Sequence, residues 1–175
     1  MIIVFTGNGK GKTTASLGQM VRVTGRGKSA LMIQFIKGPW TSGEDEFVKT
    51  LGLPPSVFEI RKMGLGFVGI LGDKLPIEDH RAAAQKALRT FITEKESEKW
   101  HLIILDEINV AVSLGLLTVD EVLDAIRDFP EDCILILSGR GAPQEFIDRA
   151  DLATEMKEIK HPFQEGKQGQ VTIEF

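Results

Sequence analysis

The segment Thr6-Gly7-Asn8-Gly9-Lys10-Gly11-Lys12-Thr13-Thr14 constrains the fold of this chain more than any other feature. It lies between a short apolar run, residues 2–6, and a stretch of helical character, residues 12–24. Glycines let backbone N–H groups turn around an anion, and the N-terminus of a helix favours negative charge. A lysine and a hydroxyl residue at the end of such a loop bind phosphate and Mg²⁺. The segment therefore predicts a P-loop.

The match to the P-loop pattern is incomplete at its start. In the pattern G-x-x-x-x-G-K-[ST] the first glycine falls on Thr6, and Gly7 comes one residue later. We therefore expect the loop to depart from its ordinary shape near the start, while Lys12 and Thr13 keep their usual places.

A second motif, Leu102-Ile103-Ile104-Leu105-Asp106-Glu107, is an apolar strand followed by two carboxylates, as in a Walker B segment. In a parallel sheet the C-terminal end of this strand opens on the same edge as the P-loop. We expect Asp106 or Glu107 to bind Mg²⁺ there, directly or through water.

The pattern of the whole chain predicts an α/β fold. Apolar runs of strand length alternate with amphipathic stretches of helical length, which is typical of a parallel sheet covered on both faces. The predicted strands are Ile2–Thr6, Ser29–Ile36, Val57–Lys62, Leu102–Asp106, Cys133–Leu137, Leu152–Ile159 and Val171–Phe175, and the predicted helices are Lys12–Thr24, Ile77–Glu96, Val119–Asp128 and Pro143–Ala150. We expect a three-layer α/β/α P-loop domain of the RecA-like type, with a mostly parallel central sheet, over residues 1–175. The glycine-rich, partly apolar region 38–76 is predicted to be a lid or a second binding surface.

Composition excludes several classes. At 175 residues the chain has the length of one domain, and its net charge of −4 with scattered lysines and arginines argues against a nucleic-acid partner. The single cysteine, Cys133, allows no disulfide within the chain and lies in an apolar run that predicts a core position. Neither a secretory segment nor a membrane span is evident, so we expect a cytoplasmic protein.

Five segments in order resemble the ATP:corrinoid adenosyltransferases of the CobA/BtuR type. They are Gly7-Asn8-Gly9-Lys10-Gly11-Lys12-Thr13-Thr14-Ala15, Gln34-Phe35-Ile36-Lys37-Gly38, Leu105-Asp106-Glu107, Ser138-Gly139-Arg140-Gly141 and Lys160-His161-Pro162-Phe163. The resemblance implies that Co(I) of a reduced corrinoid, cobalamin or cobyrinic acid a,c-diamide, attacks the 5′ carbon of ATP and that triphosphate leaves. It also implies that ATP binds in a reversed orientation.

The resemblance further implies a role for each site residue. Lys12, Thr13 and Glu107 are expected to be catalytic, and Thr13, Asp106 and Glu107 to hold Mg²⁺ or Mn²⁺. The residues implied to contact the substrates are Gly7, Asn8, Gly9, Lys10, Gly11, Lys12, Thr13, Thr14, Arg22, Phe67 and Arg140. For Arg22 and Arg140 a solvated surface charge is an equally good interpretation.

Two departures from the family pattern concern the corrinoid. The family commonly has a Gly-Phe-Thr-Trp-like segment whose aromatic rings press on the corrinoid, and here the segment is Gly66-Phe67-Val68-Gly69. Phe67 is then expected to act alone or with another aromatic residue such as Phe163, and a buried loop anchor is the alternative for Phe67. Some members also carry an N-terminal extension over the corrinoid, whereas this sequence opens on its first strand.

The resemblance implies a homodimer and an electron-donor flavoprotein as partners. Two other functions stay open from the residues alone. One is an ordinary ATPase or small-molecule kinase, which would release ADP. The other is a module that binds ATP or a corrinoid without turnover.

Overall fold

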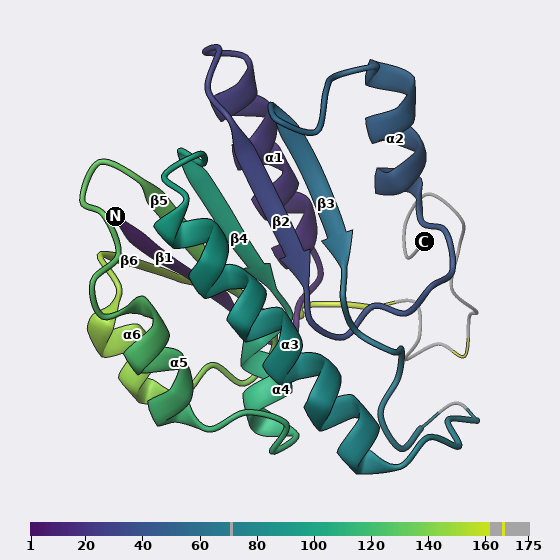
Figure 1. The fold of residues 1–175 in the computed structure, drawn as a ribbon. Helices are drawn as coiled ribbons and strands as arrows, with labels where there is room; N and C mark the ends of the chain where they lie inside the picture. The colour runs from purple at the N-terminus through teal and green to yellow at the C-terminus, as the bar shows by residue number, and fades with distance from the viewer. Residues whose placement is uncertain (71, 162–165, 167–175) are drawn as a thin grey trace.

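One six-stranded sheet forms the centre of the molecule, and every neighbouring pair of the described strands is parallel (Figure 1). The computed structural model describes residues 1–70, 72–161 and 166. The strands are β1 (Ile2–Thr6), β2 (Ala30–Gln34), β3 (Phe58–Lys62), β4 (Leu102–Asp106), β5 (Ile134–Ser138) and β6 (Leu152–Glu155). Their order across the sheet is β3-β2-β4-β5-β1-β6.

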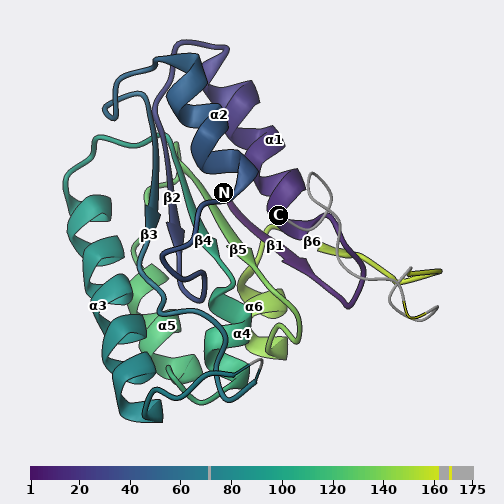
Figure 2. The same cartoon turned by 90° about the vertical axis from the view of Figure 1, so that its right-hand side faces the viewer.

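Helices cover both faces of this sheet, as seen edge-on in Figure 2. On one face lie α1 and α2, and on the other lie α3, α4, α5 and α6 (Figures 1 and 2). The helices are α1 (Lys12–Thr24), α2 (Gly43–Leu51), α3 (Ile77–Glu96), α4 (Ile108–Ser113), α5 (Val119–Ile126) and α6 (Gln144–Arg149). The predicted three-layer α/β/α architecture is therefore confirmed. No helix in the described ranges is both long and apolar enough to cross a membrane.

Alternating strand residues supply two hydrophobic cores, one on each face of the sheet. Val4 and Leu105 point into the core beneath α3, α5 and α6, whereas Phe5 and Ile104 point into the core beneath α1. All four side chains are almost completely buried. Burial on both faces explains why the central strands are continuous apolar runs in the sequence.

Most predicted elements are present within a few residues of their expected bounds. The ranges of β1, β4, α1 and α3 agree with the prediction, and β6 ends at Glu155, not at Ile159. Cys133 lies just before β5 and is partly exposed, so its predicted core position is wrong. The predicted strand Val171–Phe175 and the aromatic Phe163 lie outside the described residues.

Two short helices were not predicted. The region 38–76 was expected to be mainly loop around one strand, but α2 occupies Gly43–Leu51 within it. The Asp45 carboxylate accepts hydrogen bonds from the Ser42 N–H (2.8 Å) and hydroxyl (2.9 Å), which fixes the first turn. Because no side chain of α2 is fully buried, its hydrophobic pattern gives little signal. The other helix, α4, begins directly after Glu107.

The strand register decides which side chains meet at the C-terminal edge of the sheet. Gln34 at the end of β2 lies opposite Asp106 at the end of β4. Phe5, one residue before the end of β1, lies opposite Ser138 at the end of β5. Three strand ends therefore bring polar side chains to the edge where the P-loop begins.

The segments that follow β2 and β3 pack directly against each other. Gly64 N–H donates to the Gln34 carbonyl (3.1 Å), and Gly66 N–H donates to the Ile36 carbonyl (2.9 Å). A Cβ atom on residue 64 would overlap the backbone of Ile36. Glycine at this position therefore lets the two segments, and the loops that they lead into, lie side by side.

Replacing Gly64 by Ala should lower the free energy of unfolding by about 2 kcal/mol, because the added methyl group meets backbone that cannot move easily. Gly18→Ala is the matched control, since a Cβ atom there meets no described atom within 4 Å. Gly18 lies inside α1, so that change should stabilise the protein by up to about 1 kcal/mol. Urea denaturation measures both, and equal effects would contradict the close packing.

Candidate active site

A cavity of about 850 Å³ lies beside the P-loop at the C-terminal edge of the sheet. It extends from the P-loop along α1 to the first turn of α2, and residues after β2, β4 and β5 complete it. Its lining residues are Gly9, Lys10, Gly11, Lys12, Thr13, Thr14, Leu17, Val21, Lys37, Thr41, Ser42, Gly43, Glu44, Glu46, Phe47, Phe58, Glu107 and Arg140. The cavity is therefore basic at the P-loop and apolar along α1.

The start of the P-loop packs against the segment that follows β6. Gly9 N–H donates to the Met156 carbonyl (2.6 Å). A Cβ atom on Gly7 or Gly9 would approach that carbonyl oxygen to 2.5 or 2.7 Å. Gly7 also has a φ of +93°, in the left-handed region. The close approach of the segment after β6 therefore requires glycine at these two positions, independently of any phosphate. This contact gives a physical reason for the unusual start of the loop.

Lys12 lies at the first turn of α1 and closes the loop on itself. Its ammonium group donates to the carbonyls of Gly7 and Gly9, both at 2.8 Å. Burial lowers the pKa of Lys12, and the nearby Glu107 carboxylate partly offsets this effect. Gly11, in the left-handed region with φ +108°, provides the sharp turn into α1. A phosphate in this loop would meet both the lysine and the helix N-terminus.

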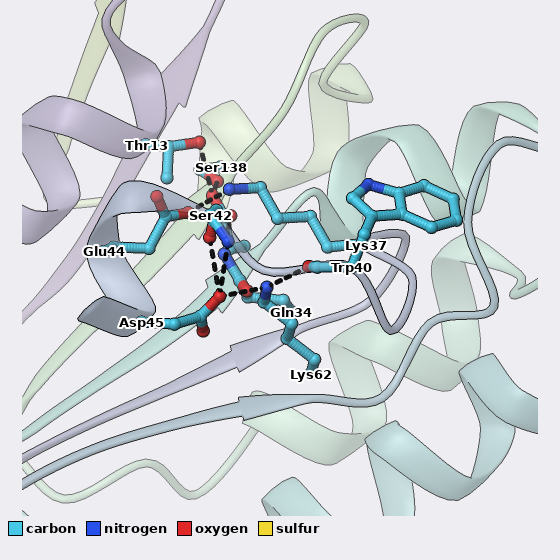
Figure 3. A network of polar contacts seen from close by, with 10 residues as sticks. Thr13, Gln34, Lys37, Trp40, Ser42, Glu44, Asp45, Lys62 and Ser138 are labelled. Atoms are coloured by element: carbon cyan, nitrogen blue, oxygen red, sulfur yellow. Dashed lines mark hydrogen bonds and ion pairs between the residues drawn. The ribbon is translucent and has the colours of Figure 1, made fainter. Parts of the chain in front are cut away.

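Asp106 is the centre of a buried hydrogen-bond network, and its partners Thr13, Gln34 and Ser138 are labelled in Figure 3. Its Oδ1 accepts from the hydroxyls of Thr13 (3.0 Å) and Ser138 (2.6 Å), and its Oδ2 accepts from Gln34 Nε2 (3.1 Å). Asp106 and Gln34 are both 0% exposed. The network therefore ties the P-loop threonine to the ends of β2, β4 and β5.

Glu107 has a different environment from its neighbour Asp106. It lines the cavity, and its backbone has φ +62°, which turns the chain into α4. Its N–H donates to the Ser138 hydroxyl at 3.1 Å. Burial, together with the negative charge of Asp106, raises the pKa of Glu107 to about 7, although Lys12 and Arg140 act in the opposite direction. Of the two acids, Glu107 is the one that faces a ligand in the cavity.

The donors around Asp106 suit a hard divalent cation. The Thr13 hydroxyl and the Asp106 carboxylate lie 3.0 Å apart, and Gln34 Oε1 is buried without a hydrogen-bond partner among the described residues. Oxygen donors of this kind favour Mg²⁺ or Mn²⁺. Within the described chain no cluster of three or more His, Cys, Asp or Glu side chains could hold a metal. Phosphate oxygens would therefore have to complete the coordination, as is usual for Mg²⁺.

Most of the predicted site residues line the cavity. The predicted residues that are not among its described lining are Gly7, Asn8, Asp106, Arg22 and Phe67. Arg140 lines the cavity, and its positive charge contributes to lowering the pKa of Lys12. Arg22 lies exposed in the last turn of α1, about 15 Å along the helix from Lys12, and is not among the described residues of the cavity lining. Phe67 also lies outside that lining and is 43% exposed, which favours a surface role over a buried anchor.

Trp40, which no sequence motif identified as a site residue, is the aromatic partner of Phe67. The two rings stack with centroids 6.0 Å apart and planes at 28°. The indole lies against two glycines, because a Cβ atom on Gly38 or Gly66 would approach its six-membered ring to 2.8 or 2.5 Å. Trp40 is 51% exposed, and it lies on the loop between the cavity residues Lys37 and Thr41. Its sequence signal was an aromatic residue in a glycine-rich loop.

Gln34 and Ser138 were also missed as site residues. Each is a buried polar residue at the end of an apolar strand, and residues of these types are uncommon at buried positions. The sequence signal for both was a polar residue at the end of an apolar strand. Their role could not be predicted from it, because the strand register is what places them next to Asp106.

The parallel sheet, the glycine-rich loop after β1 and the carboxylates after β4 define a P-loop nucleotide-binding protein. The family model described as ATP:corrinoid adenosyltransferase BtuR/CobO/CobP matches residues 1–175. The chain belongs to this family and is a transferase, as its motifs predict.

Curated relatives agree with this assignment over the full chain. The corrinoid adenosyltransferase of Escherichia coli (strain K12) is 33% identical over 175 residues, which span 100% of this chain and 85% of that protein. Corrinoid adenosyltransferase CobA of Salmonella typhimurium has the same identity and coverage. The corrinoid adenosyltransferase of Sinorhizobium sp is 36% identical over 177 residues, covering 100% of this chain and 80% of the relative.

Replacing Ser138 by Ala should lower the free energy of unfolding by about 1–3 kcal/mol, because a buried carboxylate oxygen and the Glu107 N–H both lose a partner. Ser113→Ala is the control, since the exposed Ser113 hydroxyl donates only to the Val110 carbonyl in its own helix. Chemical denaturation of both variants measures the difference. A loss for Ser138→Ala no larger than for the control would show that the Asp106 network does not stabilise the fold.

Proposed function

We propose that this chain transfers the 5′-deoxyadenosyl group of ATP to the Co(I) ion of a reduced corrinoid at the cavity beside the P-loop. Family membership supports the reaction. The main support for placing the reaction in this cavity is its lining, because Lys12 and Thr13 line the same cavity as Glu107 and Arg140. A triphosphate bound there has cationic side chains and a helix N-terminus within reach.

The reaction needs charge stabilisation more than proton transfer. The cobalt electron pair attacks the 5′ carbon, the bond from that carbon to the 5′ oxygen breaks, and its electron pair leaves with triphosphate. Cobalt is thereby formally oxidised from Co(I) to Co(III), and no proton moves. Lys12 and Arg140 would stabilise the charge that develops on the departing oxygens, a transition-state effect. The Gly9 N–H already donates to the Met156 carbonyl, so it is not the donor that a phosphate oxygen meets in this arrangement.

Thr13, Asp106 and Glu107 are the proposed ligands of Mg²⁺ or Mn²⁺. When bound, the metal supplies further neutralisation of the triphosphate leaving group. The hydrogen bond between Thr13 and Asp106 (3.0 Å) and the buried Gln34 beside them support this assignment, because they hold the oxygen donors in place.

Phe67 and Trp40 are the proposed contact surface for the corrin ring. Their rings are flat, stacked and about half exposed, and the Trp40 loop also contributes Lys37 and Thr41 to the cavity. The family pattern has an aromatic residue at the position of Gly69, where a Cβ atom would meet no described atom within 4 Å. We propose that Trp40 supplies the second aromatic ring from the other loop.

The partners and the cellular location are further proposals that rest on the family resemblance. The family resemblance supports a homodimer, a cytoplasmic location and a reduced flavoprotein as the electron donor that produces Co(I). Size-exclusion chromatography with light scattering would test the first, and a coupled assay with and without a reduced flavoprotein would test the last.

The test of the reaction is a product assay under anaerobic conditions with ATP, Mg²⁺ and chemically reduced corrinoid. We expect a cobalt–carbon bond to form, which absorption spectroscopy detects. Inorganic triphosphate should be released in an amount equal to that of the adenosylated corrinoid. Lys12→Ala should lower kcat/KM for ATP by about 100-fold or more, because the main cation of the loop is lost. Lys74→Ala, outside the cavity lining, is the matched lysine control.

Other products would overturn the proposal. ADP and phosphate with an unchanged corrinoid would indicate phosphoryl transfer, and binding without any product would indicate a non-catalytic module. A Lys12→Ala variant with nearly normal turnover would exclude the assigned phosphate site.

Phe67→Ala and Trp40→Ala should each raise KM for the corrinoid roughly tenfold, since each removes a large stacked ring from the contact. The Kd for ATP should stay unchanged in both. Ile70→Ala is the control, because Ile70 is a similarly exposed apolar residue on the same loop (59%) outside the stacked pair. A loss of thermal stability with an unchanged corrinoid KM would assign the pair to loop structure alone.

A further inference from the structure

Lys37 is a cation of the cavity that the P-loop does not account for. It lies just after β2, and it lines the cavity together with Lys12, Thr13 and Arg140. Figure 3 shows its side chain extended towards the side of the site where Thr13 and Ser138 lie.

The ammonium group of Lys37 is neutralised by a carboxylate from α2. Lys37 and Glu44 form a close ion pair, and the Glu44 side chain is only 13% exposed. Burial alone would raise the pKa of Glu44, but the hydrogen bond and charge of Lys37 outweigh it and the pKa is lowered. The pair therefore places a charged carboxylate in a cavity whose proposed ligand carries several negative charges.

A carboxylate and a triphosphate in the same cavity compete for the same cation. Phosphate oxygens carry more charge than one carboxylate and form strong charge-assisted hydrogen bonds with lysine. The first turn of α2, which carries Glu44, contributes no residue to either hydrophobic core. A second ion pair, Lys62 with Asp45, holds the same turn of α2 outside the cavity lining.

We propose that Lys37 is a further phosphate-binding residue of this active site, and that the incoming triphosphate displaces Glu44 from it. Glu44 is then a positioning residue, which keeps the Lys37 ammonium group at the cavity wall before the nucleotide arrives. This inference rests on the proposed function, because it takes the triphosphate of ATP as the ligand. It adds a cation from the segment after β2 to the cations that the P-loop and Arg140 supply to the same cavity.

Titration calorimetry with inorganic triphosphate and Mg²⁺ tests the inference without any corrinoid. Lys37→Ala should weaken triphosphate binding about tenfold or more, the effect of a lost hydrogen bond to a charged group. Lys62→Ala is the matched control, since it removes the other lysine paired with α2, and it should change Kd less than twofold. Glu44→Gln should bind triphosphate several-fold more tightly, because a competing charge is removed.

The double variant Lys37→Ala/Glu44→Gln distinguishes a direct contact between Lys37 and triphosphate from an effect of the net charge of the cavity. It has the same net charge as the wild type, so an equal Kd would mean that Lys37 acts only by neutralising Glu44. We expect binding at least about fivefold weaker than in the wild type, because the contact itself is lost. If Lys37→Ala fails to fold, Glu44→Gln and the conservative Lys37→Arg carry the test, with Lys37→Arg expected to retain binding.

The outcomes distinguish this inference from the proposed reaction. Unchanged triphosphate binding in Lys37→Ala, or no tightening in Glu44→Gln, overturns the role of Lys37 even if the wild type adenosylates corrinoid. Conversely, a wild type that binds triphosphate through Lys37 but forms no cobalt–carbon bond overturns the proposed reaction and leaves the phosphate contact standing.

Discussion

The buried carboxylate of Asp106 is the interaction on which the geometry of this site depends. A carboxylate that is completely buried is stabilised only if hydrogen-bond donors surround it, and here Thr13, Gln34 and Ser138 supply them. These donors come from the P-loop, β2 and β5, so one acceptor fixes the relative positions of three separate segments. Asp106 lies at the buried centre of these contacts, whereas its neighbour Glu107 lines the cavity.

The two sides of the cavity differ in how firmly they are built. The P-loop follows β1 and Glu107 follows β4, both of which have apolar cores on their two faces. The first glycines of the P-loop pack against the Met156 carbonyl. The opposite side consists of loops and α2, which has no fully buried side chain and is attached by ion pairs. This difference suits a reaction in which the triphosphate is held rigidly while a large corrinoid has to approach the other side.

Close backbone contacts connect the loops on that second side. Glycines at 64 and 66 let the segment after β3 lie against the segment after β2, and the same contacts position the Trp40 ring beside Phe67. An aromatic surface is thereby assembled from two loops although Gly69 offers no side chain. In the proposed function, Trp40 from the neighbouring loop takes the place of the aromatic ring that the family pattern has at position 69.

Local signals in the sequence determined the strands, the main helices, the P-loop and its paired carboxylates. Each of these depends on residues close in the chain, such as the glycines before Lys12 or the apolar run before Asp106. Only the tertiary structure decided that Gln34 and Ser138 meet Asp106, that Trp40 stacks on Phe67 and that Glu44 neutralises Lys37. Those contacts depend on strand register and on the packing of loops, which join residues distant in sequence, and no local pattern encodes them.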